Sequence, residues 1–201
     1  MSYYWKKTTD ALTEPITTAQ AKAALNIDHT DDDTLIGVYI AQARKKVETD
    51  TGRAFINQTM TLYADSFSEF DKGIIYLPRA PLVSVTTIKY YNSSNVQTTW
   101  SSAEYQVDTG HEPGRVTTVS GYSYPTVYDR LNPVEIAYVV GYGADASLIV
   151  NCPGEMMAAL YMLIGHMYEN REAVALGTIA SKVPNGYDEL VGSVQLGWSY
   201  K

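Results

Sequence analysis

One segment limits the possible folds of this chain more than any other, because it predicts a helix without a polar side. Residues 154–171 read GEMMAALYMLIGHMYENR, and from Met156 to Tyr168 only His166 is strongly polar. A helix on the surface of a monomer shows one apolar stripe and one polar face. The apolar run covers 13 residues, fewer than the roughly 20 that span a bilayer. We therefore expect this helix to be covered on several sides, by the chain's own core, by another subunit, or by both.

The distribution of charge argues against one class of function. The 201 residues carry a formal net charge of −7, to which residues 1–60, 61–120 and 121–201 contribute −1, −2 and −4. No segment forms the basic patch that tight, salt-dependent binding of nucleic acid requires. An acidic surface repels phosphate, which argues against a protein that grips DNA but leaves open a surface past which DNA slides without sticking. The 17 tyrosines and a charged content of 18% favour sheet and contact surface over a charge-coated monomer.

The cysteine content and the N-terminal sequence indicate in which cellular compartment the protein is made. Cys152 is the single cysteine, so no disulfide framework exists within the chain. We interpret it as a small buried residue, since no base or second cysteine flanks it. The start of the chain, MSYYWKKTTD, lacks the apolar run of a signal peptide. We expect a soluble protein that is made in a cytoplasm.

Two helices are predicted before residue 56. Thr17 and Gln20 have the spacing of a capping box, and Thr30 and Asp33 repeat it. Gly52 is a plausible stop for the second helix. The second helix carries one apolar stripe at helical spacing, formed by Leu35, Ile36, Tyr39, Ile40, Ala43 and Val47.

From about residue 57 to 141 the period of the hydrophobic pattern changes to two, which indicates half-buried strands. Met60, Leu62 and Ala64 alternate with polar or aromatic neighbours, and residues 134–140 do the same. An apolar phase shift within residues 83–91 predicts a bulge, and Asn92–Asn95 reads as a hairpin turn. Helices and strands are segregated along the chain, so the fold class is α+β with a mostly antiparallel sheet. Further strands are predicted at 74–77, 83–91, 96–100, 105–108 and 115–119.

No constellation in the sequence supports catalysis, a metal or a cofactor. The run Asp28–Asp33 fails the calcium-loop template, which needs a Gly at its sixth position, and suits a helix cap better. His29, His111 and His166 show no zinc-protease spacing, and we expect His166 to be structural. Neither a Gly-x-Ser-x-Gly elbow nor a Gly-rich phosphate loop is present. We expect neither an enzyme nor a cofactor-binding protein.

Several segments, in this order, resemble one known family. They are residues 14–22 (EPITTAQAK), 31–36 (DDDTLI) with 41–44 (AQAR), 51–54 (TGRA), 77–85 (LPRAPLVSV), 138–143 (YVVGYG) and 152–172. Each piece alone is weak, but the ordered set is similar to the head–tail connector, or adaptor, proteins of long-tailed double-stranded-DNA bacteriophages. The resemblance covers roughly residues 14–190.

The resemblance implies a structural virion protein of the neck, where the head joins the tail. Such proteins form a ring, typically dodecameric, beneath the portal protein and above a stopper or tail-completion protein. The ring extends the DNA channel, through which double-stranded DNA passes without sequence-specific binding, and no membrane is involved. The resemblance also implies a helical connector core, of two N-terminal helices and a long C-terminal helix, with the β-rich domain inserted into it. We place the parts at 1–56 and 146–191 for the core, 57–145 for the β-rich insertion and 192–201 for a C-terminal arm.

A ring offers an explanation for the apolar helix, because a neighbouring subunit would cover the side that the protomer leaves open. Glu169–Glu172 is then either a solvated helix end or part of a contact, and Arg and Tyr are favoured at interfaces. The residues predicted for the subunit interface are Met157, Tyr161, Ile164, Tyr168, Glu169, Arg171 and Arg44.

The C-terminus and the tyrosines suggest two further surfaces. Leu196, Trp198 and Tyr200 alternate around small residues, which suits an extended arm that adds to a strand edge, and in the family the C-terminal arm docks on the portal. A frayed terminus is the alternative.

A different function altogether is suggested by the aromatic residues Tyr90, Tyr91 and Trp100 and by residues 122–128. It is a β-rich, tyrosine-lined binding module of a phage particle, for carbohydrate or associated with the tail.

Overall fold

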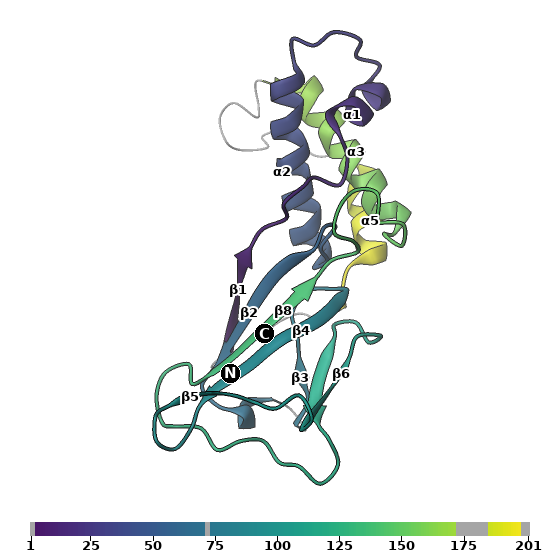
Figure 1. Cartoon of the computed structure of the whole chain (residues 1–201). Coiled ribbons are helices and arrows are strands. Elements are labelled where there is room, and N and C mark those ends of the chain that lie inside the picture. Colours follow the sequence, from purple (N-terminus) through teal and green to yellow (C-terminus); the bar gives the residue numbers. More distant parts are fainter. Residues whose placement is uncertain (1–2, 71–72, 172–184, 198–201) are drawn as a thin grey trace. The chain divides into compact units, whose positions relative to one another are not determined.

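The computed structural model describes residues 3–70, 73–171 and 185–197, and the chain in it divides into two compact units. We call residues 12–56 and 142–197 the helical unit, and residues 3–11 and 57–141 the β unit (Figure 1). The predicted α+β class is confirmed, since helices and antiparallel sheets are both present. No helix among the described residues combines the length and apolar character that a membrane span needs.

The helical unit begins with α1 (Thr18–Leu25), and its predicted capping box is confirmed. The Thr17 hydroxyl accepts the N–H of Gln20 at 3.2 Å, and the Gln20 side chain accepts the N–H of Thr17 at 2.8 Å. Together these bonds satisfy two backbone donors that the first turn of a helix leaves free. Helix α1 ends at Asn26, which adopts the left-handed conformation with φ of 56°.

Helix α2 (Asp33–Thr51) presents the predicted apolar stripe, in which Ile36, Tyr39, Ile40, Ala43 and Val47 are buried. Gly52 ends the helix with φ of 72°, as predicted. The predicted capping box of Thr30 and Asp33 is wrong. The N-cap residue is Asp32, and it makes no side-chain cap hydrogen bond, because its carboxylate is used elsewhere, as described below.

The remaining helices of this unit are α3 (Gly154–Glu169) and α5 (Asn185–Val194). Helix α3 confirms the predicted helix and follows Pro153, which occupies its N-cap position. It packs against α1, α2 and α5. The side chains of α3 that these contacts bury are Met156, Ala159, Leu160, Leu163, Ile164 and Met167.

The β unit contains a five-stranded antiparallel sheet in the order β1-β2-β8-β4-β5 (Figure 1). Its strands are β1 (Tyr3–Thr9), β2 (Gln58–Ala64), β8 (Val134–Val140), β4 (Leu82–Tyr91) and β5 (Gln97–Thr99). Alternation is clearest in β8, where every second side chain from Val134 is buried. The predicted irregularity in β4 is confirmed, since the register between β4 and β8 shifts at Leu82/Ser84 and at Val85/Thr87.

Strand β1 was not predicted from the sequence. It pairs with β2 at the edge of the sheet, with Tyr3 opposite Ala64 and Trp5 opposite Leu62. Most of its side chains are exposed. The N-terminal residues 3–11 therefore belong to the β unit, and not to the helical core in which the sequence predicts residues 1–56.

A second, three-stranded sheet has the order β3-β7-β6. Its strands are β3 (Ile75–Tyr76), β7 (Arg115–Thr118) and β6 (Tyr105–Asp108), with a short 3-10 helix, η1 (Phe67–Glu69), before β3. Ile75 and Val116 are opposite one another and fully buried. Gly114, just before β7, contacts Leu82 of β4, so a side chain at position 114 would collide with the larger sheet.

Candidate interaction surfaces

The apolar helix α3 is covered mainly by helices of its own chain, yet one side of it stays partly open. Met157, Tyr161 and Tyr168 are half-buried, and Glu169 and Arg171 are exposed. These five predicted contact residues are therefore accessible at the outer surface of the helical unit. Ile164 has a different position, because it is fully buried in this unit.

Arg44, also predicted for the subunit interface, lies inside the helical unit with 2% of its surface exposed. Its Nε donates to Glu14 at 2.7 Å and its Nη1 to Glu48 at 3.2 Å. The other carboxylate oxygen of Glu48 accepts the N–H of Phe55 at 3.0 Å. A buried charge must be paired to be tolerated, and here Arg44 ties the segment before α1 to α2.

A second polar cluster joins the end of α3 to the start of α2. The Tyr168 hydroxyl donates to Asp32 Oδ2 at 2.7 Å, and Arg171 donates to the same carboxylate from Nη2 at 2.7 Å and from Nη1 at 3.3 Å. The guanidinium lies over the Tyr168 ring, 4.3 Å from its centre. The hydrogen bond from Tyr168, followed by that from Arg171, holds the pKa of Asp32 below its usual range, and the same bond raises the pKa of Tyr168.

The acidic run Asp28–Asp33 thus contributes Asp32 to helix packing. Within the described part of the chain, no three His, Cys, Asp or Glu side chains come together as a metal site would require. Cys152 is no better candidate for chemistry, since burial raises the pKa of its thiol to about 12. A thiol with such a pKa holds almost no thiolate at neutral pH, and the thiolate is the reactive form.

The segment after α5 is attached to the helical unit as far as Leu196. The N–H of Leu196 donates to the Thr51 carbonyl at 2.9 Å, and its side chain lies against Gly52. Arg53 donates from Nε to the Val194 carbonyl at 2.7 Å and from Nη1 to the Tyr142 hydroxyl at 2.8 Å. Of the predicted arm residues, Leu196 is therefore bound to its own chain, and Trp198 and Tyr200 lie outside the described residues.

The aromatic residues of the β unit form a cluster that is mainly internal. Trp100 is only 2% exposed and packs against Phe67, Tyr105 and Tyr124, with ring centres 5.0–5.4 Å apart. Its Nε1 donates to Glu104 at 2.8 Å. The predicted alternative of a binding module relied on an exposed Trp100, and the structure places this residue in the core. Tyr122 and Tyr128 are exposed.

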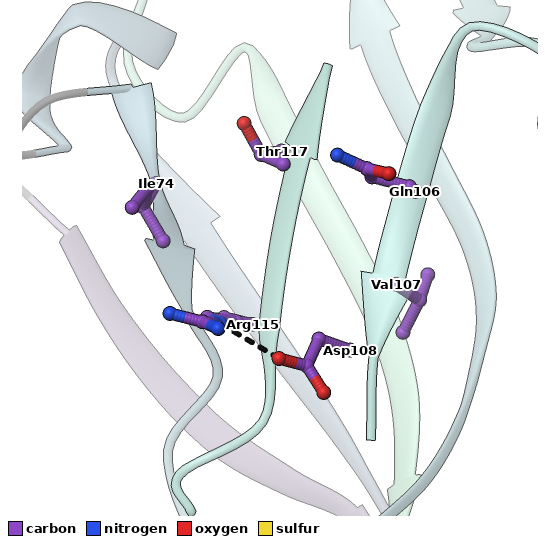
Figure 2. A pocket seen from close by; sticks show the side chains of 6 residues that line it. All are labelled: Ile74, Gln106, Val107, Asp108, Arg115 and Thr117. Carbon is purple, nitrogen blue, oxygen red and sulfur yellow. Dashed lines mark hydrogen bonds and ion pairs between the residues drawn. The ribbon is translucent and has the colours of Figure 1, made fainter. Parts of the chain in front are cut away.

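A pocket of about 280 Å³ lies on the three-stranded sheet and was not anticipated from the sequence. Figure 2 shows Arg115 of β7 and Asp108 of β6 joined by the 2.9 Å ion pair between Nε and Oδ2. The second oxygen of Asp108 accepts the N–H groups of Gly110 and His111. The hydrogen bond from Arg115 is the main reason that the pKa of Asp108 is lowered. The pocket is lined by Ile74, Gln106, Val107, Asp108, Arg115 and Thr117.

The negative charge is concentrated in one of the two units. The helical unit holds 13 acidic and 7 basic residues, a formal charge of −6, whereas residues 1–11, 57–141 and 198–201 hold 9 acidic and 8 basic residues, a formal charge of −1. Most of the exposed acidic side chains of the helical unit have no described partner, while Lys22, Arg44, Lys46 and Arg171 are paired with carboxylates.

The chain resembles known proteins in sequence and in fold. Residues 15–112 match the family model of the phage gp6-like head–tail connector proteins. No curated protein matches the sequence significantly. Two solved structures resemble the fold with a TM-score of 0.76 and 20% sequence identity. They are a chain in the neck of an empty gene transfer agent (GTA) particle computed with C6 symmetry, with 98% of this chain and 97% of that chain covered, and a chain in the virion of a native GTA particle, with 97% and 96% covered. A chain in the neck of a native GTA particle, computed with C12 symmetry, gives a TM-score of 0.74 and 21% identity over 98% of this chain and 97% of that chain.

Proposed function

We propose that this chain, whose residues 15–112 match the model of the phage gp6-like head–tail connector family, is a head–tail connector that forms a ring in the neck of a phage-like particle. In this role it is a structural virion protein that joins the DNA-filled head to the tail and extends the DNA channel. The family match over residues 15–112 is the observation on which the proposal rests. A fold shared over nearly the whole length with neck chains of GTA particles supports it. The role needs no catalytic step and no cofactor.

The symmetry of the similar structures supports a closed ring, and the C12 case favours twelve subunits. A ring is built from one heterologous contact that repeats until the rotation closes. We assign one side of this contact to the partly open side of α3, with Met157, Tyr161, Tyr168, Glu169 and Arg171. The half-buried Met157 and Tyr161 supply apolar area, which contributes about 25 cal/mol per Å² when it is removed from water.

A head–tail connector contacts other components of the particle, and these are the partners that we propose for this chain. The proposed partners are a portal protein above the ring, a stopper or tail-completion protein below it, and double-stranded DNA in the channel. The helical unit carries a formal charge of −6, which would keep DNA from adhering to a wall that it lines. The ring is assembled in the virion from subunits made in the host cytoplasm.

The C-terminal arm is the proposed portal contact, and the attachment of Leu196 to Thr51 indicates where the chain can be truncated to test it. Removal of residues 198–201 leaves the bond between Leu196 and Thr51 in place, so the fold should be unchanged while portal binding is lost. Leu196→Ala is the matched variant, because it alters the attachment of the arm and keeps Trp198 and Tyr200. Undiminished portal binding by the truncated chain would refute this assignment.

A cryo-EM map of the particle neck tests the central proposal, with native mass spectrometry of the purified chain and its portal as the rapid form. We expect the chain in a closed ring directly beneath the portal. Met157→Glu should prevent ring closure without unfolding the protomer, whereas Val96→Glu, at an exposed apolar position of the β unit, should not. A neck whose ring contains no copy of this chain would contradict the proposal.

A further inference from the structure

The pocket on the three-stranded sheet presents hydrogen-bond donors that the chain itself does not use. Of the three guanidinium nitrogens of Arg115, only Nε donates to Asp108. The two terminal nitrogens of Arg115 form no hydrogen bond with any described residue. Figure 2 shows the guanidinium lying between Asp108 and the strand that follows Ile74. The Gln106 amide on the neighbouring strand is exposed and has no described partner either. A planar acceptor in this pocket would therefore accept hydrogen bonds from the terminal nitrogens of Arg115 and from the Gln106 amide.

The orientation of Arg115 is fixed before any ligand arrives. Asp108 accepts two backbone N–H groups with one oxygen and Arg115 Nε with the other, so both carboxylate oxygens are occupied by fixed groups. A held guanidinium loses less side-chain entropy on binding than a mobile one. Its planar fork matches a carboxylate, to which it donates two parallel hydrogen bonds. Ile74 and Val107 add an apolar lining that suits the methylene groups of a Glu or Asp side chain.

From this geometry we infer that the Arg115 pocket binds a carboxylate side chain from the helical unit of a second copy of the chain. The inference rests on the proposed ring, and the positive charge of Arg115 selects a carboxylate as the occupant. Both units are negative overall, but the helical unit holds 13 of the 22 acidic residues and −6 of the formal charge of −7, so it is the main source of acceptors. Acceptor and donor then lie on different surfaces of the chain, as a repeating heterologous contact requires. The exposed carboxylates of the helical unit without a described partner are Asp28, Asp31, Glu155, Glu169, Asp188 and Glu189.

The variant Arg115→Lys allows the proposed contact to be tested by chemical cross-linking. It places a primary amine in the pocket, and a carbodiimide then joins that amine to any carboxylate in contact with it, with loss of one water and formation of an amide. Rings assembled from an equal mixture of ¹⁴N- and ¹⁵N-labelled chains distinguish a link between copies from one within a copy. Mass spectrometry of the peptides identifies the carboxylate.

The expected result is a mixed-isotope link from position 115 to one of the carboxylates of the helical unit. Arg130→Lys is the matched control, since it places the same amine at another position of the β unit and should give no such link. In parallel, Arg115→Gln should weaken association between neighbouring copies by about two- to five-fold, the range of an exposed ion pair, while the protomer loses no more stability than its exposed pair with Asp108 contributes.

Three results would overturn the inference, and they are distinguishable. A ring that forms normally while position 115 links only within its own chain, for instance to Asp108, rejects the pocket contact and leaves the proposed function intact. A link to another neck protein rejects the second copy as the occupant. Absence of any ring in the particle rejects the proposed function, and this contact with it.

Discussion

The hydroxyl of Tyr168 donates a 2.7 Å hydrogen bond to the carboxylate of Asp32, and so fastens the last turn of α3 to the start of α2. Arg171, two residues beyond α3, binds the same carboxylate. One acidic side chain therefore holds the end of the longest apolar segment in place, at the point where the chain leaves the described part of the helical unit.

Asp32 should make stability depend on pH. Its pKa is lowered in the folded state, first by Tyr168 and then by Arg171. A carboxyl of this kind stabilises fully above its unfolded pKa, about 3.9, and loses that contribution as the pH falls through the folded pKa. Asp32→Asn should therefore lower the free energy of unfolding at pH 7 and have a progressively smaller effect below about pH 4, in urea titrations at several pH values. Asp31→Asn is the control, and identical pH profiles for both variants would contradict the prediction.

Substitution of a buried side chain of α3 should mainly affect folding, and substitution of an accessible one should mainly affect assembly of the ring. Ile164→Ala removes a fully buried side chain and should cost about 2–5 kcal/mol of the free energy of unfolding. Met157→Ala is only half-buried and should cost less in the protomer while it weakens the ring. Chemical denaturation of the monomer and native mass spectrometry of the ring measure the two effects. Should Met157→Ala unfold the monomer as strongly as Ile164→Ala, the open side of α3 is not a contact surface.

Arg44 should be a folding residue. Arg44→Met leaves the carboxylates of Glu14 and Glu48 without their cation, and removing one partner of a buried ion pair costs about 3–5 kcal/mol. Thermal unfolding is the measurement. Lys46→Met, which breaks the exposed pair with Asp50, should cost less than about 1 kcal/mol. Equal losses for the two variants would show that burial does not distinguish these ion pairs.

Gly141 should tolerate no side chain. Its φ is 145°, and a β-carbon there would lie 2.6 Å from the backbone nitrogen of Asn57. Gly141→Ala should therefore cost about 1–3 kcal/mol for the backbone conformation, together with the cost of overpacking. Gly154→Ala is the control, since nothing lies within 4 Å of its added methyl group. Urea denaturation compares the two variants, and a neutral Gly141→Ala would refute the steric argument.

Much of the fold could be predicted because its signals are local. The capping box of Thr17 and Gln20 and the left-handed Gly52 are encoded within one turn of helix, and the alternation of Val134, Ile136 and Tyr138 encodes a strand with one buried face. The resemblance to head–tail connectors is confirmed by the family match. Strand β1 escaped prediction because Tyr3–Thr9 carries two lysines and little alternation. It forms a strand through its pairing with β2, which is a tertiary effect.

The candidate contact residues were harder to place, for physical reasons. Arg44 is among the residues predicted for the subunit interface, but Glu14 and Glu48, from separate parts of the sequence, pair with it inside the unit. Charged residues are seldom buried, and no local pattern indicates that this one is. Trp100 was expected outside, yet aromatic neighbours that are distant in sequence enclose it. The Arg115 pocket left no sequence signal, because its lining comes from β6, β7 and the residue before β3.

The discontinuity of the helical unit has a consequence for the order in which the protein forms during translation. Strand β8 ends at Val140, so every strand of the five-stranded sheet is synthesised before Gly154, where α3 begins. Helix α2 is made early, but the helix that covers its apolar stripe is made only after the sheet is finished. A chain released between these two points would contain every strand of the sheet, together with a helix α2 whose apolar stripe lacks the cover of α3, and exposed apolar surface of this kind is recognised by chaperones and proteases.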